Sequence, residues 1–592
     1  MKPVIIGIIV MLMLSCNNQT KETPPKNSKE LADFFDKYYE ERLQWYPLEA
    51  TMIGDPRYND RLSIEFTDSY RGKLRDFYSR YLTEAQNYKR DELNETDKIN
   101  YDVFVYEAKM NLDALAFKDN YIPFHQFYGL TLTMGQLGSG GGIQPFKTVK
   151  DYDDWIKRAS AFSAWADSAI VYFKKGIEAG VVLSQSIVVK MIPQMKAIPA
   201  ANIRESIFYG PVAKIPAAFS DADKSRLTGG FEKMIREQLE PAYKKLGDFL
   251  QNEYLPKARS TSGIDGIPGG KEYYTFLVKQ QTTTDKTPDE IYETGLREVA
   301  RISALMDSVK NSTGFKGSLN EFFEYMRTDK KFMPYKNPKE VLDAFERIHQ
   351  TMIPYLAKMF HHTPKTGFEI RQTEAFRAAS ASAEYMQGAP DGSRPGIFYV
   401  PILDATTFNT TSGMESLFLH EAIPGHHYQL SLQQEDTLLP KFRRFGGNNA
   451  YVEGWALYCE SLGKELGLYT DPYQYMGALG DEMHRAIRLV VDVAIHSKGM
   501  TREEAIKYMM DHEAISEQGA TAEIERYMVI PGQALGYKIG ALKIRELRHK
   551  YEKQLGANFN LAAFHDELLK DGALPLSILE AKMDKWAKNY KL

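Results

Sequence analysis

The chain has 592 residues, of which 43% are hydrophobic and 26% are charged, a balance that is ordinary for a globular protein with a large core. Its 74 basic and 78 acidic residues are mixed along the chain and give a net charge of -4, so no nucleic-acid partner is expected. The chain contains only two cysteines, which excludes a disulfide framework.

The amino terminus predicts export from the cytoplasm. A basic start at Met1-Lys2 precedes an apolar run over Pro3–Leu14, which is too short to cross a bilayer as a helix. The stretch Met13–Cys16 resembles a bacterial lipobox, which implies a signal peptide over residues 1–15 and lipid attachment at Cys16. We therefore expect an exported lipoprotein, anchored to a membrane of the bacterial cell envelope and either periplasmic or at the outer membrane. The alternative is an ordinary signal peptide with an incidental cysteine.

The rest of the chain predicts helices. Residues 16–30 hold the lipidated cysteine and a polar stretch without apolar period, which predicts a flexible tether. Beyond it, apolar residues recur at three- and four-residue intervals, as in Asp151–Gly176 and Leu479–His496. Helix starts with a capping box, or with a cap followed by proline, occur at Thr287–Glu290, Ser318–Glu321, Thr501–Glu504 and Asn337-Pro338. We expect a mainly α protein in which residues 31–592 form a single catalytic unit of one or two lobes.

Strand signals are few. Gly367–Arg371 and Gly396–Leu403 are short and rich in β-branched and aromatic residues, which predicts a small sheet. The second of these strands is expected to form a sheet edge, along which an extended peptide can add itself as a further strand.

The motif with the clearest chemistry is Leu419–His427, which contains His420, Glu421, His426 and His427. In the zinc-hydrolase motif H-E-x-x-H, two histidines one helical turn apart bind the metal, and the glutamate takes a proton from the activated water. Here the second histidine follows after six or seven residues, and an unbroken helix would place His427 about 10 Å away. Because proline cannot continue a regular helix, Pro424 predicts a bulge that brings His426 into the ligand position.

A third ligand is expected in the downstream helix Glu453–Glu460. Glu453 and Glu460 are seven residues apart, on one helical face, and lie among apolar and aromatic residues where an unpaired carboxylate is costly. Glu453 is predicted as the metal ligand, and Glu460 as a partner that holds a histidine N–H. The alternative is that these carboxylates cap or salt-bridge neighbouring helices. Cys459 in this helix is expected to be a buried free thiol.

Three further polar residues, Arg488, Asp492 and His496, are spaced four apart and share one helical face. We expect Asp492 to orient His496, and Arg488 to meet a substrate carboxylate. An ordinary ladder of salt bridges along the helix is the alternative interpretation.

Several segments resemble the bacterial family called domain of unknown function 885: Asp391–Gln429, Thr282–Val299, Glu453–Glu460, Arg488–His496 and Pro531–Gly540. The resemblance covers nearly all of the mature chain. It implies a place among the zincin-like metallopeptidases, near the angiotensin-converting-enzyme-like and carboxypeptidase-Taq-like enzymes, and many members of the family are predicted lipoproteins. The implied fold is a zincin-like helical clam-shell with a deep cleft and a small β-sheet beside the active-site helix.

The resemblance also implies roles for single residues. Matching the Gly-His pair of the relatives' motif to Gly425-His426 favours His426 over His427 as the second ligand. Those relatives have a late Arg-Tyr pair whose tyrosine donates to the oxyanion, and Arg526-Tyr527 matches it in type and order. Tyr537 is a second option for this donor.

Together these features predict a zinc-dependent peptidase that cleaves oligopeptides outside the cytoplasm, with one Zn²⁺ per chain held by His420, His426 and Glu453. Glu421 would serve as general base and Tyr527 as oxyanion donor. His427, Glu460, Arg488, Asp492, His496, Arg526 and Tyr537 would bind substrate or support these groups. Two other functions stay open: a metal hydrolase acting on non-peptide amides or esters, and a lipoprotein that binds peptides or glycans without cleaving them.

Overall fold

The structure is a computed structural model, which describes residues 26–373, 382–390, 392 and 394–590. The predicted signal peptide and Cys16 lie outside the described residues. The first helix, α1, already begins at Lys26, so residues 26–30 are helical and the predicted tether is shorter than expected. Among the described residues, no helix is long and apolar enough to cross a membrane.

The fold is mainly α, as predicted. The amino-terminal helices are α1 (Lys26–Trp45), α2 (Pro47–Met52), α3 (Asp68–Ala85), α4 (Glu95–Ala114), α5 (Leu130–Gly138), α6 (Val149–Ser160), α7 (Phe162–Ala179), α8 (Gln185–Lys196), α9 (Gly210–Ala213), α10 (Asp221–Met234) and α11 (Glu240–Phe249). Four more precede the sheet: α12 (Gly270–Thr282), α13 (Pro288–Ser312), α14 (Leu319–Thr328) and α15 (Pro338–Met359). After the sheet come α17 (Met414–Glu421), α18 (His426–Glu435), α19 (Lys441–Arg444), α20 (Asn449–Glu460), α21 (Pro472–Ser497), α22 (Arg502–His512), α23 (Glu517–Val529), α24 (Leu535–Leu555), α25 (Leu561–Leu569) and α26 (Leu576–Asn589).

The predicted helix starts are confirmed. Thr287, Ser318 and Thr501 each form a complete capping box, and Asn337 caps α15 directly before Pro338. The periodic stretch Asp151–Gly176 is not one helix but two, α6 and α7, which meet at Ala161.

The sheet has three strands, β1 (Phe368–Gln372), β2 (Glu384–Met386) and β3 (Gly396–Val400), in the order β1-β3-β2. β1 runs parallel to β3 and β2 antiparallel to it. The prediction that the strand at Gly396 is an edge strand is therefore wrong, because β3 is central and fully buried. The prediction failed because β2, which covers the other side of β3, has only three residues and no recognisable strand pattern.

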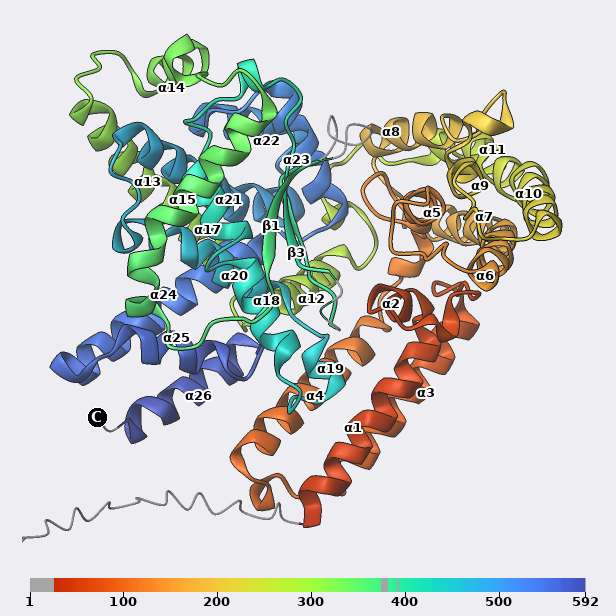
Figure 1. The fold of residues 1–592 in the computed structure, drawn as a ribbon, viewed down its shortest axis with the longest axis horizontal. Coiled ribbons are helices and arrows are strands. Elements are labelled where there is room, and N and C mark those ends of the chain that lie inside the picture. Colours follow the sequence, from red (N-terminus) through yellow and green to blue (C-terminus); the bar gives the residue numbers. More distant parts are fainter. Residues whose placement is uncertain (1–25, 374–381, 391, 393, 591–592) are drawn as a thin grey trace, which may run out of the picture.

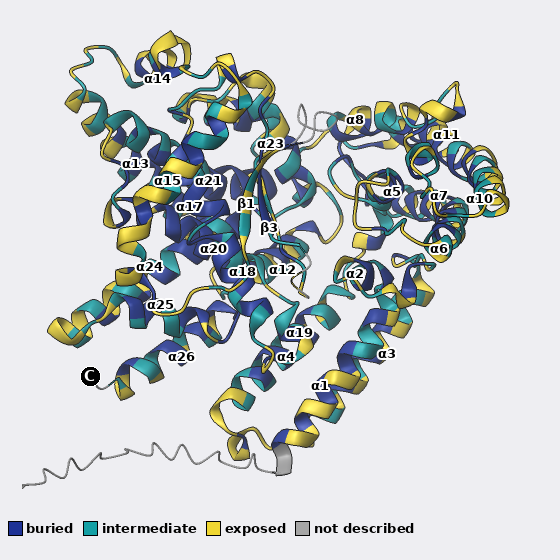
Figure 2. Ribbon diagram, in the orientation of Figure 1, coloured by how far each residue is buried: buried dark blue, intermediate teal, exposed yellow. Residues whose placement is uncertain are grey.

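Buried apolar side chains form two clusters, and α21 contributes to both. Leu489 and Val493 belong to the cluster that contains the sheet and α17, whereas Ile487 and Val490 belong to the cluster formed with α5–α8, α10 and α11. Figure 2 shows α17, α20 and α21 as largely buried helices in the middle of the larger part of the molecule. Whether residues 31–592 act as one unit stays a prediction.

The sheet lies beside α17, as predicted. The ring of Phe418 in α17 contacts Phe368 of β1 at 6.0 Å and Phe398 of β3 at 6.3 Å between centroids. Figure 1 shows α5–α11 as a separate group of helices, while the sheet and α17–α26 lie in the larger group. Two cavities have volumes of about 470 and 440 Å³, and neither is lined by a residue of α17, α18 or α20. The deep cleft predicted at the active-site helix α17 therefore stays a prediction.

Candidate metal centre

The central motif is folded as two helices with a sharp break between them. α17 ends at Glu421 and α18 begins at His426, so the four residues from 422 to 425 leave the helical path. Only glycine fits at position 425, because a Cβ there would lie 1.9 Å from the carbonyl oxygen of His420. The indole Nε1–H of Trp455 donates to the carbonyl of Pro424 at 2.8 Å, which fixes the break against α20.

This break brings the three predicted ligands together. Glu453 Oε2 lies 3.6 Å from Nε2 of His420 and 3.4 Å from Nε2 of His426. In a tetrahedral zinc site with bonds of about 2.1 Å, two ligand atoms are about 3.3 Å apart, so these separations fit. The two imidazole rings are nearly perpendicular, at 88°, and both present Nε2 to the same carboxylate.

Electrostatics keep Glu453 ionised. Burial alone would raise its pKa, but the neighbouring His426 and His420 hold it well below the usual value. A carboxylate must be deprotonated to bind a metal, so this environment suits a ligand.

Glu421 lies beside the ligands. One carboxylate oxygen is within 4.8 Å of a ring nitrogen of both His420 and His426. The side chain is nearly buried, and burial raises its pKa above the ordinary value. A carboxyl of raised pKa next to a metal site is suited to accepting and returning a proton.

Glu460 supports the first ligand, as predicted. Its Oε1 accepts a hydrogen bond from His420 Nδ1 at 2.7 Å, so the other ring nitrogen, Nε2, is directed at Glu453. Glu460 also lies 3.8 Å from the Arg485 guanidinium. A carboxylate behind a histidine is the usual way to fix the tautomer and orientation of a metal ligand.

His427 turns away from Glu453, whereas His426 faces it. Its Nδ1 lies 3.0 Å from the hydroxyl of Tyr385 in β2, and its ring contacts Phe368 in β1. It is 2% exposed, and burial lowers its pKa to about 4, so it is a neutral packing residue between α18 and the sheet. The prediction that His427 binds substrate or supports the site is therefore not met by its position.

Tyr527 is fully occupied by other residues. Its hydroxyl donates to Glu523 at 2.6 Å and accepts from Arg488 Nε at 2.9 Å. Arg488 also donates to Glu523 at 3.1 Å, so its predicted partner, a substrate carboxylate, is replaced by a carboxylate of the protein. Tyr527 is 1% exposed and has no proton to offer to a substrate in this arrangement.

Tyr537 lies within electrostatic reach of Glu453. α20 and α24 touch at Gly454 and Gly540, where a Cβ on Gly540 would lie 1.8 Å from a backbone oxygen of α20. This contact places Tyr537 of α24 near Glu453 of α20, and burial and the Glu453 carboxylate both raise the pKa of Tyr537. The Arg488 guanidinium lies 4.6 Å from the centre of the Tyr537 ring and holds it in place.

Asp492 and His496 do not form the predicted pair. Asp492 accepts from the Tyr274 hydroxyl at 2.6 Å and from the backbone N–H of Gly532. His496 accepts from the backbone N–H of Ile264 at 2.9 Å and donates through Nε2 to the carbonyl of Tyr527 at 2.9 Å. Each side chain is instead hydrogen-bonded to residues of other segments, and through Tyr527 and Gly532 both anchor the segment around α23.

Arg526 lies at the same end of α23. It donates to the Gln533 side chain at 2.8 Å and lies 3.7 Å from Glu523, with its side chain 21% exposed. It therefore supports the Tyr527 segment and keeps some access to solvent.

Sequence reasoning missed four charged residues that complete this region. Asp481, His484 and Arg485 of α21 share its polar face with Arg488, and Glu523 of α23 meets them. The three- and four-residue spacing of the α21 residues was a usable signal, whereas Glu523 joins them only through the packing of α23 on α21.

Comparisons with known proteins agree with this fold. The family model described as "Bacterial protein of unknown function (DUF885)" matches residues 47–583. The chain is similar to a "putative lipoprotein" from Colwellia psychrerythraea, with 30% identity, a TM-score of 0.88, and coverage of 96% of this chain and 100% of that one. A "putative lipoprotein of unknown function" from Shewanella oneidensis shows 19% identity and a TM-score of 0.72, over 93% and 99% of the two chains. A Pyrococcus furiosus carboxypeptidase has a TM-score of 0.40 at 10% identity, over 96% and 99%, too low to carry an argument. No functionally curated protein matches the chain.

Proposed function

The chain belongs to the bacterial family of unknown function DUF885, and we propose that it is a zinc-dependent peptidase. The single observation that carries this proposal is the convergence of His420, His426 and Glu453, with separations of 3.4 and 3.6 Å between ligand atoms. Glu421 is adjacent and Glu460 orients His420, so a general base and a supporting carboxylate accompany the ligands.

The donor set suits zinc. Two neutral imidazoles and one carboxylate are the ligands of many catalytic zinc sites, and they leave a coordination position for water. A bound zinc ion supplies Lewis acidity toward water and toward a scissile carbonyl. We assign His420, His426 and Glu453 to hold one such ion per chain.

The protein's own groups would do the rest of the chemistry. Glu421 would accept the proton of the attacking water and return it to the leaving amine. The Tyr537 hydroxyl would donate to the oxyanion as charge develops, because a phenol of raised pKa keeps its proton. The Arg488 guanidinium would position the Tyr537 ring, and the Tyr527 hydroxyl would hold Arg488.

The proposed location of the protein rests on two structural neighbours and on the amino-terminal sequence. Two structural neighbours of this chain are described as "putative lipoproteins", and the amino terminus carries a lipobox-like stretch ending at Cys16. We therefore propose an exported enzyme that is anchored to the cell envelope through Cys16 and acts on peptides outside the cytoplasm.

The direct test of the proposed function is the Glu421→Gln variant. Loss of the general base should lower the rate of peptide cleavage by about 10² to 10⁴-fold while leaving bound zinc unchanged. Peptide cleavage is measured on a mixed peptide library by mass spectrometry, and zinc by elemental analysis. Glu415→Gln on the same helix is the control, because among the described residues the hydrogen bond that Glu415 accepts comes from the backbone N–H of Tyr469. A Glu421→Gln protein that cleaves as fast as wild type would overturn the assignment.

A further inference from the structure

A cavity of about 440 Å³ lies where the loop after α7, the segment around Ile264 and the end of α23 meet. Apolar side chains form most of its wall: Val181, Val182, Ile264, Ile267, Met528 and Val529. Its volume is in the range of about 300–1,000 Å³ that small-molecule sites occupy in proteins.

The polar group that distinguishes this cavity is Arg259. Its Nε donates to the carbonyl of Val182 at 3.0 Å, and its Nη1 donates to the backbone carbonyl of Thr261. Asp265 is near enough to act electrostatically, but among the described residues no carboxylate forms an ion pair with Arg259. Burial lowers the pKa of Arg259 to about 10, because desolvation disfavours the charged guanidinium.

His125 adds a hydrogen-bond donor to the same wall. Its Nδ1 accepts from the backbone N–H groups of Phe127 and Tyr128, both at 3.3 Å, which leaves the ring proton on Nε2. Burial lowers the pKa of His125 to about 4, so the ring is neutral near pH 7. The exposed Lys118 lines the cavity as well, with its ammonium over the Tyr121 ring.

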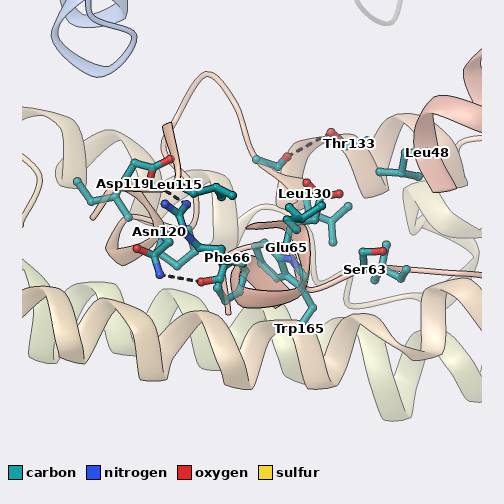
Figure 3. A pocket seen from close by; sticks show the side chains of 16 residues that line it. Leu48, Ser63, Glu65, Phe66, Leu115, Asp119, Asn120, Leu130, Thr133 and Trp165 are labelled. Atoms are coloured by element: carbon teal, nitrogen blue, oxygen red, sulfur yellow. Dashed lines mark hydrogen bonds and ion pairs between the residues drawn. The ribbon is translucent and has the colours of Figure 1, made fainter. Parts of the chain in front are cut away.

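The one carboxylate in the wall does not neutralise these donors. Asp119 is paired with Arg71 at 2.9 Å, and Arg71 lies in the neighbouring cavity of about 470 Å³. Figure 3 shows Asp119 beside Asn120 at one end of that second cavity. Among the described residues, neither Arg259 nor Lys118 forms an ion pair, so no direct contact neutralises these two cations of the first cavity.

We propose that this cavity binds a small apolar carboxylate, with the carboxylate at Arg259 and His125 and the hydrocarbon part against the apolar wall. A guanidinium forms strong charge-assisted hydrogen bonds with a carboxylate, and the apolar wall accounts for the rest of the ligand. Two sources share this chemistry: a fatty acid, and the free carboxyl terminus of a short apolar peptide.

The wall of the cavity is hydrogen-bonded to the segment that contains Tyr527. Ile264 in its wall donates its backbone N–H to His496, which in turn donates to the carbonyl of Tyr527. Met528 and Val529 in the wall follow Tyr527 directly. A ligand in the cavity therefore contacts the segment that positions Tyr527 and Arg488, although its binding requires neither metal nor turnover.

The test is calorimetric titration of the purified protein with decanoate and with N-acetyl-leucyl-leucine, each beside its uncharged amide. At least one acid should bind at least 10-fold more tightly than its amide. Binding of decanoate alone identifies a lipid source and binding of the peptide acid alone a peptide source. The proposal is overturned if neither acid binds better than its amide.

Variants separate the site from general effects on folding. Arg259→Met should weaken acid binding at least 10-fold, whereas Lys257→Met, an exposed cation two residues away, should leave it unchanged. Ala179→Phe fills the cavity while keeping every hydrogen bond of Arg259, and it should abolish binding at an unchanged melting temperature. Wild-type affinity in both Arg259→Met and Ala179→Phe would contradict the site.

Discussion

Two tyrosines near the candidate metal centre differ in their partners, and this difference predicts different effects of removing each hydroxyl. Tyr537 lies next to Glu453, whereas the Tyr527 proton is given to Glu523. Tyr537→Phe should therefore lower kcat by about 10² to 10³-fold, the usual loss for one oxyanion donor, with little change in stability.

Tyr527→Phe is the matched variant. It removes a partner of the buried Arg488 and of the partly buried Glu523, so it should lower the melting temperature and reduce kcat less than Tyr537→Phe does. Steady-state kinetics and thermal denaturation of both variants separate the two roles. A larger loss of kcat in Tyr527→Phe, with Tyr537→Phe unchanged, would return the oxyanion role to Tyr527.

At the scale of elements, His484 joins three helices. This residue of α21 lies 2.9 Å from Glu513 at the end of α22 and 3.5 Å from Glu523 of α23. Burial and Arg488 lower its pKa, but Glu513 and Glu523 outweigh them, so the pKa in the folded state is above 6.5. The stabilisation that follows is complete below pH 6.5 and is lost as pH rises through the raised pKa.

The melting temperature of wild type should therefore fall relative to that of His484→Gln, which lacks the titrating group, as the pH rises above 6.5. Arg526 and the hydroxyl of Tyr527, which both contact Glu523, stay in both proteins. Parallel pH profiles of the two melting temperatures would show that His484 does not hold the three helices together.

The elements that carry a local signal were predictable from the sequence. Capping residues such as Thr287 mark helix starts because the backbone N–H groups there need side-chain partners. His420 and Glu453, which the structure brings together, could be singled out from the sequence because each lies in a short motif with its own chemistry. The partners of Asp492 and the central place of β3 were not, since both depend on segments far away in sequence.

The choice between His426 and His427 also depends on a contact that the sequence does not show. Spacing alone left both open, because the direction of the chain after Pro424 depends on the contact of its carbonyl with Trp455 of α20. Once this contact is formed, α18 begins at His426 and directs His427 to Tyr385 of the sheet.

At the scale of the whole molecule, a buried ion cluster joins α13, α21 and α24. Lys538 is 1% exposed and lies 2.9 Å from Glu298 and 2.7 Å from Glu482. Lys538→Met removes one cation from two partly buried carboxylates that keep Arg301 and Arg545 as partners, so the free energy of unfolding should fall by about 1.5–3 kcal/mol.

Lys550→Met is the control for this cluster. Lys550 pairs with Asp584 at 2.6 Å on the surface, and an exposed pair contributes at most about 1 kcal/mol. Denaturation with urea compares the two variants with wild type. Equal losses of stability would mean that the cluster does not hold the three helices together.

We propose that one metal ion is held by His420, His426 and Glu453. These residues lie in three helices, α17, α18 and α20, that the fold brings together. The most direct measurement is the zinc content of purified wild type, His426→Ala and His427→Gln, determined by elemental analysis after dialysis. We predict about one zinc per chain in wild type and in His427→Gln, and loss of zinc in His426→Ala. Zinc that is absent from wild type after incubation with the metal, or retained in His426→Ala, would contradict the account.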